Sequence, residues 1–126
     1  MRNPLSRSMM HVNVRRSDLA ATLYQKAFNA EFVARYANDD GTFMHAELDI
    51  YGQIVSLMEL PSEKVIPGNT MMFGLHFKKG QEALVQQAYD ALKDGAEIQE
   101  PIGPCDYSPL QFVLVDRFGV NWCIFV

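Results

Sequence analysis

The sequence predicts an α+β domain made of two copies of a βαβββ unit. Two observations predict it. Strand-type and helix-type hydrophobic patterns follow one another in that order twice within 126 residues, and a segment rich in proline and glycine separates the two occurrences. The length corresponds to a single domain, and 48% hydrophobic and 21% charged residues are typical of a globular protein. Because one unit cannot bury its own sheet face, we expect the two units to fold together.

The first unit is predicted at residues 9–60, after a flexible polar arm at 1–8. Ser17 and Asp18 are suited to begin a helix, which is predicted to end near Asn29. The apolar stripe of this helix consists of Leu19, Leu23, Tyr24, Ala27 and Phe28. Strands are predicted at 9–14, 31–36, 43–50 and 53–60.

The strand at 43–50 has a period-two alternation, which predicts two different faces. Met44, Ala46, Leu48 and Ile50 are expected on one face, and Phe43, His45, Glu47 and Asp49 on the other. An imidazole and a carboxylate two residues apart are typical of a base with its orienting partner, but the polarity of an exposed strand gives the same pattern.

The second unit is predicted at residues 71–126, after a linker at 61–70. A helix is predicted at 81–94, ending before Gly95, and the segment 101–109 is predicted to be a loop because it contains three prolines and a glycine. Strands are predicted at 71–77, from 96, at 111–115 and at 120–126.

Short sequence matches support a duplication. The residues Ala30-Glu31-Phe32 resemble Ala96-Glu97-Ile98, and each triplet follows a predicted helix. Leu48–Gly52 matches Val115–Gly119 in the same way, at a predicted turn between strands.

Charge and composition exclude several classes of partner. Eleven Lys and Arg against 15 Asp and Glu give a net charge of −4, which does not attract nucleic acid or an anionic membrane. The sequence has no apolar run of the length of a signal peptide or a membrane span, so we expect a cytoplasmic protein. Two cysteines, Cys105 and Cys123, are expected to be free thiols.

Two segments resemble a known family. The residues DRFGVNW at 116–122 resemble a signature of the PhnB-like branch of the vicinal oxygen chelate superfamily, which includes glyoxalases and bleomycin resistance proteins, and MHAEL at 44–48 resembles the third strand of that branch. The resemblance covers residues 9–126 and implies that the two βαβββ modules form a curved mixed sheet around a cavity, a glyoxalase-like fold. It also implies a homodimer.

The same resemblance assigns four metal-ligand positions. They fall at His11, Ser56, Met72 and Cys123, of which only His11 matches the ligand type of the superfamily. Because the set lacks two carboxylates and a second imidazole, we expect a degenerate metal site. We expect no cofactor, and a divalent metal is the one cofactor that the resemblance leaves open.

Pleat alternation then divides the strand residues between two faces. Val12, Val14, Phe73, Leu75, Phe77 and Trp122 are expected to face the helices. The cavity face is expected to hold His11, Asn13, Ile54, Ser56, Met58, Met72, Gly74, His76, Cys123 and Phe125. This mixture of apolar, hydroxyl, amide and imidazole groups suits a small organic ligand.

These observations favour a binding protein over an enzyme. The first hypothesis is a glyoxalase-fold protein that binds a small organic molecule in its cavity. The alternative is a metal-dependent isomerase or lyase of the same superfamily, whose ligands would come from His11, His45, Glu47 or His76. A third possibility is a structural or regulatory dimer with no ligand. The sequence has no glycine-rich cofactor loop, so methyltransferase activity has no support.

Overall fold

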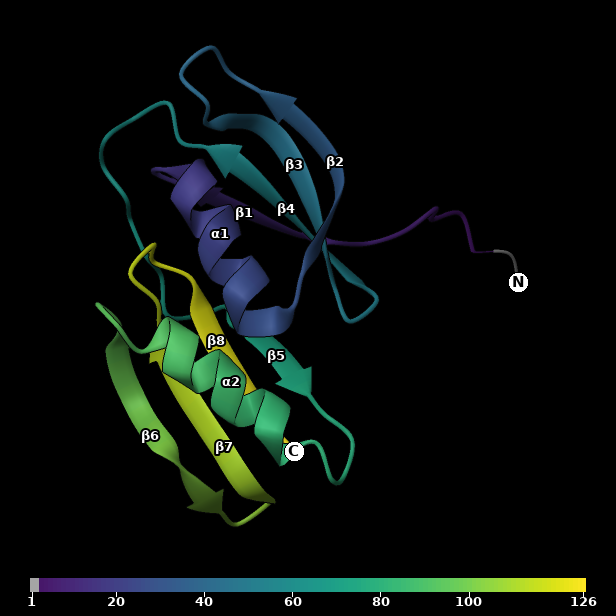
Figure 1. Ribbon diagram of the computed structural model, residues 1–126, viewed down its shortest axis with the longest axis vertical. Coiled ribbons are helices and arrows are strands. Elements are labelled where there is room, and N and C mark those ends of the chain that lie inside the picture. The colour runs from purple at the N-terminus through teal and green to yellow at the C-terminus, as the bar shows by residue number, and fades with distance from the viewer. Residues whose placement is uncertain (1–2) are drawn as a thin grey trace.

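The computed structural model of the chain describes residues 3–126 and contains the two expected modules (Figure 1). Residues 1 and 2 of the predicted arm lie outside the described residues. The first module consists of β1 (Met10–Val14), α1 (Ser17–Phe28), β2 (Glu31–Ala37), β3 (Phe43–Ile50) and β4 (Gln53–Glu59). The second consists of β5 (Phe73–His76), α2 (Glu82–Leu92), β6 (Glu97–Cys105), β7 (Ser108–Val115) and β8 (Asn121–Phe125). The α+β class and the βαβββ repeat are confirmed.

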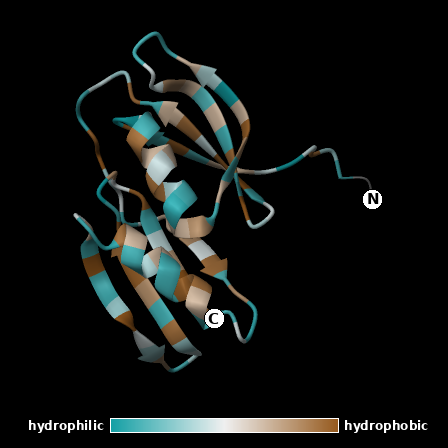
Figure 2. Ribbon diagram, in the orientation of Figure 1, coloured by the Kyte–Doolittle hydropathy of each residue, from teal (hydrophilic) through white to brown (hydrophobic). Residues whose placement is uncertain are grey.

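Each module forms a four-stranded mixed sheet with one helix against it. The strand orders are β1-β4-β3-β2 and β5-β8-β7-β6, so the first and last strand of each module pair in parallel and the other pairs are antiparallel. Both helices lie in front of the sheets in Figure 1 and contact each other. In the part of the chain that the structure describes, the opposite side of each sheet carries no helix, and we call these two surfaces the open faces. Hydrophobic and hydrophilic residues alternate along the strands, as Figure 2 shows.

The two modules share one hydrophobic core. The ring of Trp122 on β8 lies 4.8 Å from that of Phe28 and 5.5 Å from that of Tyr24, both on α1 of the other module. All three side chains are fully buried. Val12 and Val14 are also buried, which confirms the predicted helix-facing side of β1. Burial of large aromatic side chains across the module boundary binds the two halves into one folding unit.

A buried carboxylate lies at this boundary. Asp116 Oδ2 accepts hydrogen bonds from the Tyr24 hydroxyl at 2.7 Å and from Trp122 Nε1 at 2.9 Å. Its Oδ1 accepts from the backbone amides of Phe118 and Val120 at 2.8 and 3.1 Å. Four donors therefore satisfy a side chain that would otherwise be costly to bury.

The duplicated segments form corresponding turns. Tyr51 and Gly52 have φ angles of 51° and 87° and join β3 to β4, and Gly119 has a φ angle of 90° in the turn between β7 and β8. Backbone in this left-handed region favours glycine, which explains why glycine ends both matching segments.

The start of α1 differs in detail from the prediction. Ser17 is its first residue, and no side chain of the preceding residue caps the helix. Instead, the Glu59 carboxylate on β4 accepts hydrogen bonds from the backbone amides of Arg16 and Ser17 and from the Ser17 hydroxyl. A carboxylate at a helix N-terminus satisfies unpaired amides and complements the helix dipole.

The predicted loop at 101–109 was wrong. Strand β6 runs through Pro101, Gly103 and Pro104 to Cys105 and pairs with β7. It is an edge strand, so a proline on its unpaired edge costs no hydrogen bond of the sheet. The register shifts between Ile98 and Cys105 accommodate the irregular residues.

Two predicted faces also need correction. Met44 is 59% exposed whereas Phe43 is buried, because the register of β3 against β2 shifts between Tyr36 and Ala37 and reverses the alternation at the start of β3. Leu19 is 45% exposed, and Ala20 takes its place in the buried stripe of α1.

Within residues 3–126, no helix has both the length and the apolar character needed to cross a membrane.

Candidate functional site

The open face of the first sheet carries a polar cluster, formed by Arg7, His11, His45, Glu47 and Ser56. Arg7 Nη1 and Nη2 donate to the two carboxylate oxygens of Glu47 at 2.7 and 2.9 Å, and His45 Nε2 lies 3.0 Å from Glu47 Oε2. His11 on β1 pairs with Ser56 on β4, and its Nδ1 is hydrogen-bonded to the Ser56 hydroxyl. The two imidazole rings are 6.4 Å apart. Each imidazole therefore has one nitrogen held by the protein, and the other nitrogen has no hydrogen-bond partner within residues 3–126.

Electrostatics keep the central carboxylate of this cluster ionised. Glu47 is 7% exposed, and its hydrogen bonds with Arg7 and His45 lower its pKa from 4.5 to about 2. Because both carboxylate oxygens already accept hydrogen bonds, Glu47 orients His45 and holds Arg7 over the face of the sheet.

The open face of the second sheet carries an aromatic shelf, formed by His76, Tyr107 and Phe125. The His76 and Phe125 rings stack at 4.4 Å with 15° between their planes, and the ring of Tyr107 lies edge-on to Phe125 at 5.4 Å. Tyr107 is 62% exposed. Next to it, partial burial raises the pKa of the Cys123 thiol, although a hydrogen bond with the Tyr107 hydroxyl opposes the shift. Cys123 is therefore mainly a neutral thiol rather than an activated nucleophile.

The predicted cavity residues fall into two groups. His11, Asn13, Ser56 and Met58 belong to β1 and β4 of the first sheet, whereas His76, Cys123 and Phe125 belong to β5 and β8 of the second. Each open face lies on the side of its own sheet away from the helices. The chain therefore places the two groups on separate sheets.

Met72 is out of register with the position assigned to it. Strand β5 begins at Phe73, and the residue paired with Cys123 is Gly74. Since His11 pairs with Ser56 in the first module, Gly74 and Cys123 form the equivalent pair in the second.

The residues present do not fit a hard divalent metal. The ligand positions that the family resemblance implies hold an imidazole, a hydroxyl, a thioether and a thiol, and the corrected register replaces the thioether with a glycine. Within residues 3–126, no group of three or more His, Cys, Asp or Glu side chains is arranged to hold a metal ion. Hard cations need oxygen donors, and zinc needs at least three protein ligands.

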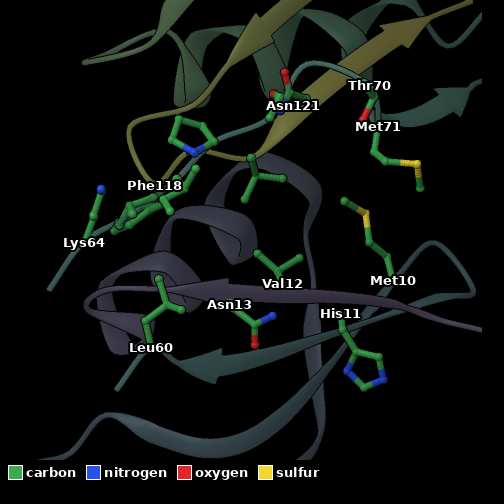
Figure 3. Close-up of a pocket in the computed structure, with 16 residues that line it drawn as sticks. Met10, His11, Val12, Asn13, Leu60, Lys64, Thr70, Met71, Phe118 and Asn121 are labelled. Atoms are coloured by element: carbon green, nitrogen blue, oxygen red, sulfur yellow. The ribbon is translucent and has the colours of Figure 1, made fainter. Parts of the chain in front are cut away.

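Two hollows border these surfaces. A groove of about 490 Å³ runs between β1, the linker and the turn before β8, and is the site drawn in Figure 3. In this view Met10 and Val12 point into the groove, whereas the His11 ring lies on the opposite side of β1. A smaller pocket of about 260 Å³ lies between β5 and the β3–β4 turn and includes Gly74 and His76.

Sequence reasoning missed Arg7, Tyr36, Tyr107 and Asp116. Arg7 was assigned to the polar arm, and its partner Glu47 is 40 residues away, so no local pattern connects them. Tyr36, whose ring lies 6.3 Å from that of His45, and Tyr107 were passed over as strand-end and loop residues. Asp116 begins the segment at 116–122 that resembles the family, but the resemblance does not indicate the four hydrogen bonds that this side chain accepts.

Comparisons with known proteins agree with this architecture. The family model described as the Glyoxalase/Bleomycin resistance protein/Dioxygenase superfamily matches residues 8–124. No curated protein matches the chain. One similar solved structure is a putative 3-demethylubiquinone-9 3-methyltransferase, PhnB protein, from Bacillus cereus, with a TM-score of 0.79, 18% identity and coverage of 95% of this chain and 98% of that chain.

Another is a point mutant of the fosfomycin resistance protein FosX from Listeria monocytogenes, complexed with Mn(II) and 1S,2S-dihydroxypropylphosphonic acid. Its TM-score is 0.68 at 16% identity, and the match covers 99% of this chain and 93% of that chain. A third, TioX from Micromonospora sp. ML1, has a TM-score of 0.61 at 21% identity over 94% of this chain and 97% of that chain. At these identities, the likeness shows a common fold.

Proposed function

Since this chain belongs to the glyoxalase/bleomycin resistance/dioxygenase superfamily, we propose that it binds a small organic molecule on the open faces of its two sheets, with a degenerate metal site. The observation that carries this proposal is that one open face holds the aromatic shelf and the other holds the polar cluster. The shelf offers flat apolar contact, and the cluster offers directed hydrogen bonds. Binding sites for small molecules combine these two elements.

The ligand class follows from these groups. A planar, aromatic or conjugated molecule would stack on the rings of His76 and Phe125, which are already stacked on each other. His11 and His45 each keep one free ring nitrogen, which donates to or accepts from a polar substituent. The ligand is therefore a planar organic molecule with polar substituents.

A second copy of the chain is part of this proposal. The open faces expose Tyr36, Met58 and Tyr107 at 60%, 37% and 62%. A homodimer that brings the shelf of one copy towards the polar cluster of the other would close the site around the ligand.

The metal-dependent alternative has weaker support. FosX, a structural relative, was solved with Mn(II), but in this chain Glu47 is fully engaged by Arg7 and His45, and Cys123 stands in the second sheet. This donor set therefore supports no reaction step at a metal ion.

The test is an NMR titration of the labelled protein with a panel of small aromatic compounds. We expect shifted amide signals at Gly74, His76 and Cys123, and weaker binding by Phe125→Ala. The matched control is Leu19→Ala, which truncates an exposed side chain on α1, on the helix side of the sheet. A panel that shifts no signal on either open face contradicts the proposal.

A parallel calorimetric titration with Ni²⁺, Zn²⁺, Co²⁺ and Mn²⁺ tests the alternative. Tight binding that is lost in both His11→Ala and His45→Ala would favour the metal-dependent reading over the binding protein. Weak binding that neither variant changes supports the degenerate site.

A further inference from the structure

The groove beside the linker has three walls. Two of them are β1 of the first module and the turn at 118–121 of the second. The third wall is the linker, which connects the modules and whose residues are exposed. The groove is distinct from the open faces, because the side chains that β1 directs into it are Met10 and Val12 rather than His11 (Figure 3).

The turn that forms the second wall is held in shape. Asp116 Oδ1 accepts the amides of Phe118 and Val120, and this carboxylate is itself buried and hydrogen-bonded to α1. These bonds fix the positions of Phe118 and Val120 at the groove before any ligand arrives. A preformed wall lowers the entropy cost of binding.

Two contacts hold the linker beside this turn. Asn121 Nδ2 donates to the backbone oxygen of Gly68 at 2.9 Å. A Cβ atom at Gly119 would lie only 3.1 Å from Val65 Cγ1, so the glycine allows the linker to pack closely against the turn. These contacts place Val65 and Pro67 of the linker along the groove, where they form its third wall.

The lining of the groove combines an apolar body with one cationic end. Met10, Leu60, Phe118 and Met71 supply apolar surface. Lys64 lies at one end in Figure 3 and forms no ion pair within residues 3–126. A volume of about 490 Å³ is within the range of about 300–1,000 Å³ of small-molecule sites.

We propose that this groove is a second ligand site, which binds a small amphipathic anion. The apolar part lies along Val12, Leu60 and Phe118, and the anionic group lies near the Lys64 ammonium. Thr70, whose hydroxyl is drawn on the wall opposite β1, provides a further hydrogen-bond donor. His11 and Asn13 also border the groove, but the His11 ring lies on the other side of β1, and the groups that the site uses are absent from the polar cluster and the aromatic shelf. The site therefore holds or fails independently of the proposed function.

The test compares two fluorescent probes with the same rings. Anilinonaphthalene sulfonate carries an anionic group, whereas phenylnaphthylamine does not. We expect the sulfonate to bind about ten-fold more tightly, and Lys64→Met to remove this advantage while leaving phenylnaphthylamine binding unchanged. Lys79→Met, an exposed lysine outside the groove, is the matched control and should change neither affinity.

Location is tested with NMR and a blocking variant. We expect the sulfonate to shift amide signals at 64–66, 68–70 and 118–121. Thr70→Trp, at an exposed position, should weaken the binding of both probes at an unchanged melting temperature. Shifts confined to Gly74, His76 and Cys123 would overturn the groove as a site and place the probe on the open faces. Equal affinity for the two probes would overturn the anionic assignment. Loss of dimers in Thr70→Trp would overturn the proposal by making the groove a subunit contact.

Discussion

Removal of the Tyr24 hydroxyl should destabilise the protein by about 2 kcal/mol, because a hydrogen bond to a charged group contributes about 1.5–3 kcal/mol. In Tyr24→Phe the Asp116 carboxylate keeps three of its four donors, including Trp122 Nε1, so the charge is not left without partners. Tyr24 is fully buried and its ring contacts remain, so no cavity adds to the cost.

Asp116→Asn should cost more, about 3 kcal/mol, although its side chain has nearly the same shape. If the amide oxygen keeps the bonds from Phe118 and Val120, its NH₂ group faces the N–H of Trp122, and two donors then oppose each other. The Tyr24 hydroxyl can rotate to accept from the amide. The two substitutions should therefore be non-additive in a double-mutant cycle.

Urea unfolding, followed by tryptophan fluorescence, measures these free energies. Tyr89→Phe is the matched control, because it also removes a tyrosine hydroxyl from a helix and that hydroxyl has no hydrogen-bond partner within residues 3–126. If Tyr24→Phe and Tyr89→Phe unfold at the same urea concentration, the Tyr24–Asp116 bond does not stabilise the fold and the reasoning is refuted.

Three further outcomes are expected. Because the pKa of Glu47 is lowered to about 2, the stability that it contributes is present above pH 4.5 and is lost as the pH falls from 4.5 towards 2. Arg7→Met should flatten this part of a plot of melting temperature against pH. An unchanged plot would refute the role of the ion pair. Light scattering should give about twice the chain mass of 14.3 kDa, and a monomer mass at micromolar concentration would exclude the homodimer. The unmodified protein should bind Ni²⁺, Zn²⁺ and Co²⁺ weakly in calorimetry, whereas the double variant Gly74→His, Cys123→Glu should bind these ions at least about ten-fold more tightly. The double variant Met72→His, Cys123→Glu is the control. An equal gain in the control would contradict the register of β5.

Element order was predictable because it depends on local hydrophobic periodicity. The helix from Ser17 and the strand at 43–50 are present with these starting residues because most of their positions follow one period, although Leu19 and Met44 depart from it. Strand β6 was not predictable in this way. Its prolines signal a loop in any local reading, and they are tolerated only because the sheet places this strand at an edge.

The site was less predictable than the fold for a related reason. The family resemblance placed His11 on the face away from the helices, and pleat alternation then placed Val12 on the helix side, where it is buried. The ion pair between Arg7 and Glu47 depends on how the arm crosses the sheet, which no local pattern encodes. The register of Met72 failed because the start of β5 is set by its pairing with β8, far along the chain.

The shared core limits where the chain can be divided. Trp122 is covered by Phe28 and Tyr24 of the other module, so a single βαβββ module produced on its own would leave these aromatic surfaces in water. Such a half-chain would need the other half, or a second copy of itself, to cover them, and that contact would depend on protein concentration. In the intact chain the linker makes the same contact intramolecular. The two equivalent turns differ in the same sense: Asp49 accepts the Gly52 amide of its own turn, whereas Asp116 also accepts the tyrosine and tryptophan donors of the joined core.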